Sequence, residues 1–382
     1  MRFWRTCVSN SGMLRRFDAE QRIARRWQLV ASCHKLARRL FFLGLIIGDD
    51  LASFPGLPWR QSLRAWKNGF VRKHFKMFGL HETGSPKDFI SDLQSLGTTQ
   101  INRRHTELIS NKLGSYTLLR HFDVPCPEVL GTIRNGELQP FGTQEFLPLK
   151  DALTTKALPR RLVLKQNWGY HGYGLLVLEQ GPDTFVLNGE SLSPPDLARV
   201  LDRLDDYLAV AFVQQAPYAQ NIFPGAANTM RLLTAWDQAA HAPLLVRAVH
   251  RIGVEKTSPV DNFGGGKGGL SACIDQETGT LGPAAKVTDQ YTVAWHDAHP
   301  ETGSQIRGVA IPGWGGIRDA ILDHARTLSF LPYLAWDVLV TDTGFSVLEI
   351  NSNSGLNVLQ VHGPLLTDDR VQRFYRHHGV VR

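Results

Sequence analysis

Hydrophobic residues recur in the N-terminal part of the chain with the period of a helix. Between Phe17 and Leu40 they are spaced by three and four positions, and arginine and lysine fill other positions of the same segment. This pattern predicts a basic amphipathic helix. The Pro/Gly stretch over residues 54–58 would end the helical region, and a second basic and aromatic segment follows it over Trp59 to Phe78.

The pattern changes at Asn111. Residues Asn111 to Phe122 predict a helix that ends before Pro125 and Pro127, because proline forces the residue before it into extended backbone. Another helix is predicted over Ile317 to Leu328. Short runs rich in Leu, Val and Ile predict strands over residues 161–166, 175–178, 208–214, 230–236, 244–252, 335–340 and 345–350. The last two predict a hairpin, because Asp, Thr and Gly within residues 341–344 separate two apolar runs.

The composition is that of a folded globular protein with room for two or three packed units. Of the 382 residues, 43% are hydrophobic and 20% are charged, which excludes a disordered or fibrous chain. The net charge of +7 is unevenly distributed. Residues 1–76 hold 16 Lys and Arg against 4 Asp and Glu, or +12, so the rest of the chain carries −5. A basic N-terminal part therefore precedes a mildly acidic body.

Cysteine usage and hydropathy indicate a soluble cytoplasmic protein. Cys7, Cys33, Cys126 and Cys273 form no CxxC pair, which argues against a disulfide framework and a cysteine zinc site. The longest apolar run, Leu40 to Gly48, is far shorter than the ~20 residues needed to span a bilayer. Two interpretations of the basic helix stay open: peripheral contact with an anionic membrane surface or polyanion, or packing of its apolar side on the body. No specific nucleic-acid partner is expected.

The first group with candidate chemistry combines a lysine with glycines. Lys165 lies near the end of the predicted strand 161–166, and Gly169, Gly172 and Gly174 follow it. Several backbone N–H groups can approach a polyphosphate only where residues lack a Cβ, and a lysine supplies a fixed cation. The spacing matches neither a P-loop nor a dinucleotide fingerprint, so an ordinary hairpin loop is the alternative.

The second group consists of oxygen ligands on the C-terminal hairpin. Glu349 and Asn351 are two positions apart on one predicted strand and so share a face, and Asp337 can join them from the partner strand. Two carboxylates and an amide oxygen are hard ligands suited to Mg²⁺, which normally bridges to substrate phosphates. These residues therefore predict a magnesium site.

The third group consists of arginines on successive predicted strands. Arg231 and Arg251, with the glycine-rich stretch that begins at Asp261, suit binding of phosphate oxygens or of a developing acyl phosphate, and both are predicted to be catalytic. The alternative is that such arginines are solvated strand residues. This alternative is preferred for Arg247, which is left out of the predicted site.

Taken in order, these motifs resemble the ATP-grasp superfamily, and more narrowly its sugar-transfer-associated branch, which is similar to glutamate-ligase-type proteins. The resemblance covers about residues 105–365 and is carried by Asn228-Thr-Met-Arg231, Asp261 to Gly279, His299 to Gly303, Ile311 to Trp314, and the strands with Asp337 and with Glu349-x-Asn351. It implies an α+β fold in which two α+β subdomains clamp ATP, with its phosphates under a mobile glycine loop. A basic helical extension would precede this fold.

The resemblance also implies residue roles and domain boundaries. Lys112 and Lys165 would bind the nucleotide with the glycine loop, Gln214 and Gln215 would meet adenine at the hinge, and Asp337, Glu349 and Asn351 would hold Mg²⁺. The basic helical region would cover residues 1–104. The part with the glycine loop would cover residues 105–215, and the C-terminal subdomain with the metal site residues 216–382.

The activity implied by the resemblance is ATP- and Mg²⁺-dependent ligation of a carboxylate to an amine through an acyl phosphate. The substrates would be small-molecule or glycan-linked carboxylates and amines, in cell-surface polysaccharide or envelope metabolism. A small-molecule kinase on the same scaffold and a nucleotide-binding adaptor at an anionic surface are the alternatives. No general base stands out, because His171, His250, His296 and His299 are each more typical of hydrogen-bonded structural histidines.

Overall fold

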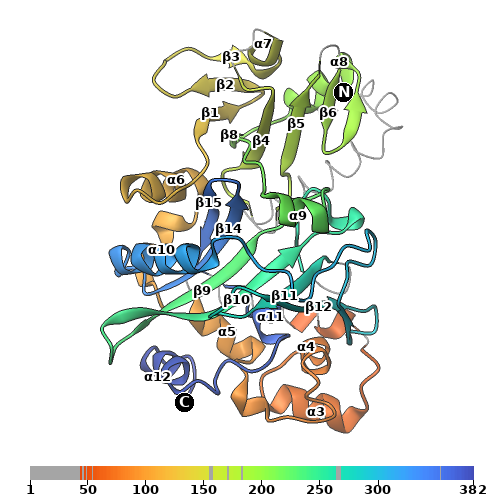
Figure 1. The fold of residues 1–382 in the computed structure, drawn as a ribbon, viewed down its shortest axis with the longest axis vertical. Coiled ribbons are helices and arrows are strands. Elements are labelled where there is room, and N and C mark those ends of the chain that lie inside the picture. Colours follow the sequence, from red (N-terminus) through yellow and green to blue (C-terminus); the bar gives the residue numbers. More distant parts are fainter. Residues whose placement is uncertain are drawn as a thin grey trace. The chain divides into compact units, whose positions relative to one another are not determined.

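The described part of the chain folds into two compact units. The computed structural model describes residues 44, 47–48, 50–53, 55–154, 158–169, 172–181, 184–263, 268–352 and 354–382. One unit contains residues 111–116 and 127–213, and the other contains the described residues up to 110 together with 117–126 and 214–382 (Figure 1). The basic helix predicted over Phe17 to Leu40 lies outside the described residues. The division at residues 104 and 215 stays a prediction.

The first unit, called here the eight-stranded unit, is built on one antiparallel sheet. The strand order is β3-β2-β1-β8-β4-β5-β6-β7. Its elements are β1 (Val129–Arg134), β2 (Glu137–Pro140), β3 (Leu147–Pro148), α7 (Leu149–Thr154), β4 (Arg161–Gln166), β5 (Leu176–Gln180), β6 (Phe185–Leu187), β7 (Glu190–Leu192), α8 (Pro194–Leu201) and β8 (Tyr207–Ala211), with the first part of α6 (Lys112–His121).

Alternating leucines form the core of this unit. Leu162 and Leu164 of β4 and Leu176 and Leu178 of β5 are buried, and the apolar side of α8 packs into the same cluster. The strand predicted over residues 161–166 is confirmed without a change of bounds. The strand predicted over 208–214 begins one residue earlier and ends three residues earlier, because its neighbours β1 and β4 offer no partner beyond Ala211.

The second unit, called here the seven-stranded unit, holds the remaining elements. Its antiparallel sheet has the order β13-β12-β11-β10-β9-β14-β15. The strands are β9 (Met230–Asp237), β10 (Ala242–Ile252), β11 (Leu270–Ile274), β12 (Leu281–Val287), β13 (Val293–His296), β14 (Tyr333–Thr341) and β15 (Gly344–Asn351). The helices are α3 (Trp59–Lys67), α4 (Arg72–Met77), α5 (Asp92–Thr98), α9 (Pro217–Ile222), α10 (Trp314–Thr327), α11 (Leu356–Gln360) and α12 (Asp369–His377), and the 3-10 helices are η1 (Pro86–Asp88), η2 (Arg103–Ile109) and η3 (Glu255–Thr257).

The central strands of this sheet are covered on both faces. Nearly every residue of β9 and β14 is buried, and one hydrophobic core packs Leu233 and Ala335 of the sheet with Leu359 of α11 and Phe374 of α12. The predicted C-terminal hairpin is confirmed, since Thr341 pairs with Gly344. The helix predicted from Ile317 begins at Trp314, because Trp314 is buried at the helix start and the two glycines after it conceal the helical period in the sequence.

The N-terminal helices of the seven-stranded unit have a small core of their own. Ala65, Phe70 and Phe75 pack together between α3 and α4. This layer is fastened to α11 by Gln360, whose side-chain amide both donates to and accepts from the backbone of Ile90 at 2.9 and 2.8 Å. No helix within the described residues is long and apolar enough to cross a membrane.

Candidate functional site

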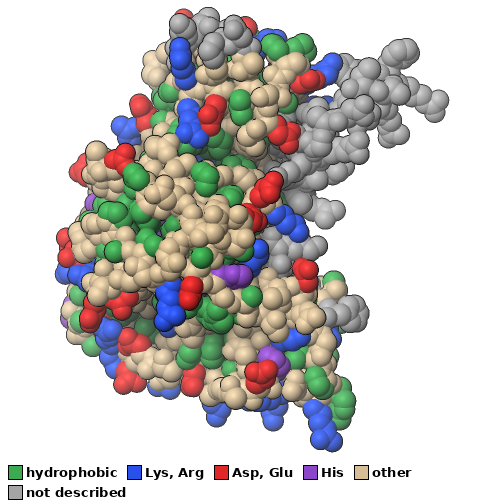
Figure 2. Space-filling model, turned by 45° about the vertical axis from the view of Figure 1, so that its right-hand side comes forward, with side chains coloured by type: hydrophobic (Ala, Val, Ile, Leu, Met, Phe, Trp, Pro, Cys, Tyr) green, Lys and Arg blue, Asp and Glu red, His purple; other side chains and the backbone are tan. Residues whose placement is uncertain are grey.

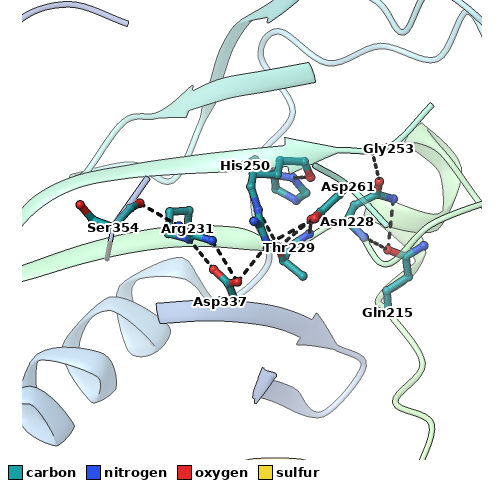
Figure 3. A network of polar contacts seen from close by, with 10 residues as sticks. Gln215, Asn228, Thr229, Arg231, His250, Gly253, Asp261, Asp337 and Ser354 are labelled. Atoms are coloured by element: carbon teal, nitrogen blue, oxygen red, sulfur yellow. Dashed lines mark hydrogen bonds and ion pairs between the residues drawn. The ribbon is translucent and has the colours of Figure 1, made fainter. Parts of the chain in front are cut away.

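A row of charged side chains crosses the middle of the seven-stranded sheet. Asp337 of β14 lies opposite Glu349 of β15 on one side and opposite Arg231 of β9 on the other. Arg231 in turn lies opposite Val249 of β10, so Arg251, two residues further on, has its side chain on the same face. We call Arg231, Arg251, Asp337 and Asp261, which joins them from the loop after β10, the ionic row (Figure 3).

A β-bulge brings Glu349 to the face of the ionic row. The register passes from Asp337 opposite Glu349 directly to Val338 opposite Val347, which leaves Leu348 as the additional residue. Side chains alternate along a strand, so without the bulge Glu349 would point to the face opposite Asp337. The bulge therefore places two carboxylates side by side. Asn351, two residues further along β15, lies on the same face.

The Arg231 guanidinium is held on two sides. It forms a bidentate ion pair with Asp337, in which Nε contacts Oδ1 and a terminal nitrogen lies 3.1 Å from Oδ2. Its other terminal nitrogen donates to the main-chain oxygen of Ser354 at 2.8 Å. Arg231 thus ties the strand pair β9–β14 to the loop that follows β15 (Figure 3).

Arg251 bridges two carboxylates. One terminal nitrogen lies 3.2 Å from both Asp337 and Asp261, and Nε donates to the Thr229 hydroxyl at 3.1 Å. Asp261 also accepts from the backbone N–H and the hydroxyl of Thr229, at 2.7 and 2.6 Å. These contacts fix the start of the glycine-rich stretch to β9 and β10. Residues 264–267 of that stretch lie outside the described residues.

Burial and ion pairing shift the pKa values of these residues in opposite directions. Burial by itself raises the pKa of the Asp337 carboxyl, but Arg231 and Arg251 outweigh it and hold that pKa below its ordinary value. Burial lowers the pKa of Arg251, but Asp261, Asp337 and Glu349 outweigh burial and raise it. The four charges of the ionic row sum to zero. Removal of any one would leave a buried, uncompensated charge, so the row is a rigid part of the sheet.

Gln215 and Asn228 brace one end of the row. The Gln215 side chain accepts from the Asn228 backbone and side-chain amides at 3.0 and 3.1 Å, and it donates to the main-chain oxygen of Ala226 at 2.9 Å. The Asn228 side chain also accepts from the Gly253 N–H at 2.9 Å. In this structure the side chain of Gln215 therefore ties the segment before α9 to β9 (Figure 3). The predicted adenine contact of Gln214 and Gln215 stays a prediction.

The histidines near the row are hydrogen-bonded and buried. His250 contacts the Tyr218 hydroxyl at 2.9 Å through Nε2 and the main-chain oxygen of Arg251 at 3.0 Å through Nδ1, and burial lowers its pKa to about 4. His299 contacts the Gly253 carbonyl at 2.9 Å. The structural interpretation fits both residues. His171 lies outside the described residues.

The predicted phosphate-binding lysines both lie in the eight-stranded unit, next to the glycine loop. Lys112, the first residue of α6, donates to the Gly169 carbonyl at 2.8 Å, and its backbone N–H donates to the Asn167 carbonyl at 3.0 Å. Lys165 of β4 is buried and donates to the Tyr116 hydroxyl of α6 at 3.0 Å. The start of α6 and the start of the loop are therefore joined, and both lysines are placed at that junction.

The loop needs glycine at two of its three predicted positions. Gly172 and Gly174 have φ values of +67° and +72°, which residues with a Cβ rarely adopt. A Cβ on Gly174 would also lie 2.7 Å from the Tyr207 hydroxyl. Gly169 has no positive φ in this structure. The glycines therefore allow a tight turn between β4 and β5, and their role in phosphate binding stays a prediction.

The oxygen donors beside the ionic row suit a hard divalent cation. Glu349 and Asn351 are half-buried and so accessible from solvent, and Asp337 lies behind them with its oxygens held by the arginines. Mg²⁺ prefers carboxylate and amide oxygens. Within the described ranges no three His, Cys, Asp or Glu side chains are grouped to hold a metal ion. The predicted set has two carboxylates and an amide, so its donor chemistry fits Mg²⁺ and its assignment stays a prediction.

The structure brings most of the predicted residues into two groups. Arg231, Arg251, Asp337 and Glu349 lie together on one face of the seven-stranded sheet, with Asn351 next to them. Lys112, Lys165 and the glycines form the second group, in the other unit. Sequence reasoning did not select Thr229, Asp261 or Asn228 as site residues. Their positions in the sequence could have indicated them, because Asn228 and Thr229 come just before Arg231 and Asp261 begins the glycine-rich stretch.

Arg247 corrects one interpretation, because it is not a solvated strand residue. It donates to the main-chain oxygens of Leu359, Gly363 and Pro364 at 3.0, 2.6 and 3.0 Å. These carbonyls lie at and beyond the C-terminal end of α11, where a helix leaves acceptors without internal partners. A bulge in β10 after Leu245 sets Arg247 opposite Leu233, on the face of the sheet that packs on α11. Arg247 therefore caps a helix end.

The family of the chain is defined by its sequence over most of its length. The model of the sugar-transfer associated ATP-grasp family matches residues 94–374. The chain belongs to this family, and its fold is the α+β ATP-grasp fold with two antiparallel sheets. No curated protein matches the chain in sequence.

Solved structures with a similar fold are distant in sequence. An ADP complex of N5-carboxyaminoimidazole ribonucleotide synthetase is 14% identical with a TM-score of 0.36, over 65% of this chain and 47% of that one. The D-alanine–D-alanine ligase of Bacillus anthracis is 11% identical with a TM-score of 0.36, over 75% and 71% of the two chains. A biotin carboxylase–ATP analogue complex of Campylobacter jejuni is 11% identical with a TM-score of 0.39, over 76% and 48%. The chain spans about half the length of the first and third of these structures.

Proposed function

We propose that the protein is an ATP- and Mg²⁺-dependent carboxylate–amine ligase. The observation that carries the proposal is the pair of accessible oxygen donors, Glu349 and Asn351, beside the neutral ionic row in a member of the ATP-grasp family. The row holds its strands in one arrangement, and the donors at its edge have the chemistry of a magnesium site. The sugar-transfer description of the family supports a carboxylate or an amine linked to a sugar as one substrate.

In the proposed reaction an oxygen of the carboxylate attacks the γ-phosphorus of ATP and ADP leaves. The amine nitrogen then attacks the acyl carbon, the C–O bond to phosphate breaks, and an amide and phosphate result with release of one proton. Mg²⁺, held by Asp337, Glu349 and Asn351, would neutralise phosphate oxygens. Lys112 and Lys165 would bind phosphate at the glycine loop, and Arg251 would add positive charge beside the metal ligands. The chain thus acts mainly by positioning and charge neutralisation.

The first test is ATP binding measured by calorimetry with and without Mg²⁺, on the wild type and on Glu349→Gln. The wild type is expected to bind ATP, and the variant is expected to lose the metal-dependent part of the affinity. Glu190→Gln, an exposed glutamate of β7, is the matched control and should bind like the wild type. Absence of ATP binding by the wild type under every metal condition would overturn the proposal.

The second test separates ligation from phosphorylation. A ligase forms ADP and phosphate only when both an acid and an amine are present, so sugar acids and amines are screened for phosphate release. A small-molecule kinase would form ADP and a phosphorylated product without free phosphate. A nucleotide-binding adaptor would bind ATP and form neither product with any pair of substrates.

A further inference from the structure

Helix α3 exposes an apolar face to solvent. Trp59, Leu63 and Trp66 are spaced by four and three residues and so lie on one side of the helix. Trp59 is 67% exposed and Leu63 50% exposed, although α3 carries a buried side through Ala65 and Ser62. Leu51 is 63% exposed. Its chain neighbour Asp50 is held against α3, because the Trp66 indole N–H donates to the Asp50 carboxylate at 2.8 Å. Among the residues that the structure describes, the helix therefore has one packed side and one apolar side that no other element covers.

Positive charge lies along one side of this apolar face. Arg60, Arg64 and Lys67 repeat the same four-and-three spacing one residue later, and all three are exposed. Between residues 51 and 81 the chain has no Asp or Glu and six Lys and Arg. The Arg60 guanidinium lies 5.5 Å from the centre of the Trp59 ring, so charge and ring are presented together. Figure 2 shows basic and apolar side chains together along the lower edge of the molecule, where Figure 1 places α3.

The helix that presents this face shares a core with α4, and α4 is tied to the rest of the unit. Arg72 of α4 pairs with Asp50 at 3.2 Å, and Lys76 donates to the Pro55 carbonyl at 2.6 Å. His74 contacts Asn357 of α11 at 3.0 Å, which joins this layer to the core of the seven-stranded unit. The exposed tryptophan and leucine are thus part of a preformed surface and do not belong to a fraying end.

We propose that this surface binds the headgroup region of a bilayer that contains anionic phospholipid. The α3 surface comprises Leu51, Trp59, Arg60, Leu63, Arg64, Trp66 and Lys67. Tryptophan and leucine enter the boundary between headgroups and acyl chains, while arginine and lysine reach anionic headgroups. The proposal is independent of the proposed ligase activity and of the helix predicted over Phe17 to Leu40.

Charge and residue type decide against other occupants. A second copy would bring its own Arg60, Arg64 and Lys67 against the same three cations, and like charges repel. Nucleic acid would match the charge and could stack on Trp59, but the aliphatic Leu51 and Leu63 have no base-pairing or stacking role. A bilayer accommodates the tryptophans, the leucines and the basic side chains at once, because it offers anionic headgroups next to an apolar layer.

The test is flotation of the full chain with vesicles of phosphatidylcholine alone and of phosphatidylcholine mixed with phosphatidylglycerol. The wild type is expected to float with the mixed vesicles and less so at high salt. Trp59→Ser/Leu63→Ser is expected to reduce binding at least about tenfold. Arg60→Gln/Lys67→Gln is expected to reduce it by about fivefold per charge. Trp295→Ser, at a tryptophan of β13 that is 51% exposed, is the matched control and should float like the wild type.

Several results would overturn the proposal. If the two α3 variants float like the wild type while their circular dichroism is unchanged, another segment carries any membrane binding. If the wild type binds heparin or single-stranded RNA but neither kind of vesicle, the surface binds polyanions. If light scattering shows a dimer that Trp59→Ser/Leu63→Ser separates, a second copy covers the face.

Discussion

The ionic row and the glycine loop hold their charged groups in different ways. In the row, each arginine contacts a carboxylate on another strand or loop: Arg231 contacts Asp337, and Arg251 contacts both Asp337 and Asp261. If one partner of a buried ion pair is removed or replaced, the other is left as an uncompensated charge in the protein interior. The row therefore acts as a frame that keeps β9, β10 and β14 in register.

At the glycine loop, two hydrogen bonds run from lysines to neutral oxygens. Lys112 donates to the Gly169 carbonyl, and Lys165 donates to the Tyr116 hydroxyl. A phosphate oxygen can replace such an acceptor with a gain, because its negative charge adds Coulomb attraction to the lysine ammonium. Mutations in the row are therefore expected to change stability, and mutations at the loop are expected to change ligand affinity.

The largest effect is expected when the frame loses its central carboxylate. Asp337→Asn should lower the free energy of unfolding by about 3 kcal/mol or more, because two buried arginines lose the charge they share. Urea unfolding followed by circular dichroism measures it. Asp342→Asn, in the exposed hairpin turn, is the control and should change stability by less than about 0.5 kcal/mol. An equally small effect of Asp337→Asn would remove the distinction between frame and loop.

Acid should weaken the seven-stranded unit next, through His250 of β10. Burial lowers the pKa of His250 to about 4, whereas the unfolded chain has the ordinary value near 6.5. The folded state therefore keeps the imidazole neutral, its contribution to stability is complete above about pH 6.5, and it falls by roughly 3 kcal/mol as pH drops to about 4. Unfolding free energies across this range should show a slope that decreases in His250→Gln. Part of the slope should remain in this variant, because His362, whose pKa burial lowers to about 3, is retained there. A slope as steep as that of the wild type would contradict the assignment to His250.

The loop is expected to respond through ATP affinity. Lys165→Met removes the ammonium group but keeps most of the apolar stem, so ATP binding should weaken by about tenfold to a hundredfold. Tyr116→Phe removes only the hydroxyl that accepts from Lys165 and should have a smaller effect. Calorimetry measures both. A loss of stability in Lys165→Met as large as that of Asp337→Asn would place this lysine with the frame.

The smallest expected effect concerns the shape of the loop. Gly174 and Gly189 both have positive φ, at +72° and +85°, but only at Gly174 would a Cβ meet a side chain, 2.7 Å from the Tyr207 hydroxyl. Gly189→Ala should cost about 1 kcal/mol of unfolding free energy from backbone strain alone. Gly174→Ala should cost about 1 kcal/mol more, because Tyr207 must move. Equal losses in urea unfolding would show that the loop tolerates the contact.

Much of the fold could be predicted because local pattern and tertiary environment agree. The strand over residues 161–166 and the hairpin around 341–344 follow from apolar runs and turn residues, and the structure has both. The strand over 208–214 was predicted too long, since its end depends on where partner strands stop. The start of α10 was missed because glycines there conceal a helix that burial of Trp314 stabilises.

The candidate site shows the same limit at the level of single residues. Alternation places Glu349 and Asn351 on one face, but the bulge at Leu348 is what makes that face the one with Asp337. Nothing in the local pattern marks this bulge. Arg247 was interpreted as solvated because its partners, the carbonyls after α11, are more than a hundred residues away in sequence.

The family, the main strands and helices, and the residue types of the candidate site could all be inferred from the order of the residues. These depend on order and local periodicity, which are read along the chain. The folded sheet was needed to show that Arg231 and Arg251 share Asp337 and that Gln215 contacts Asn228. Packing among the described residues showed which side of α3 is exposed. The partners of buried charges depend on strand register, and a register shift by one residue turns every side chain of a strand to the other face of the sheet. The burial of a helix face depends on packing between segments that are distant in the sequence.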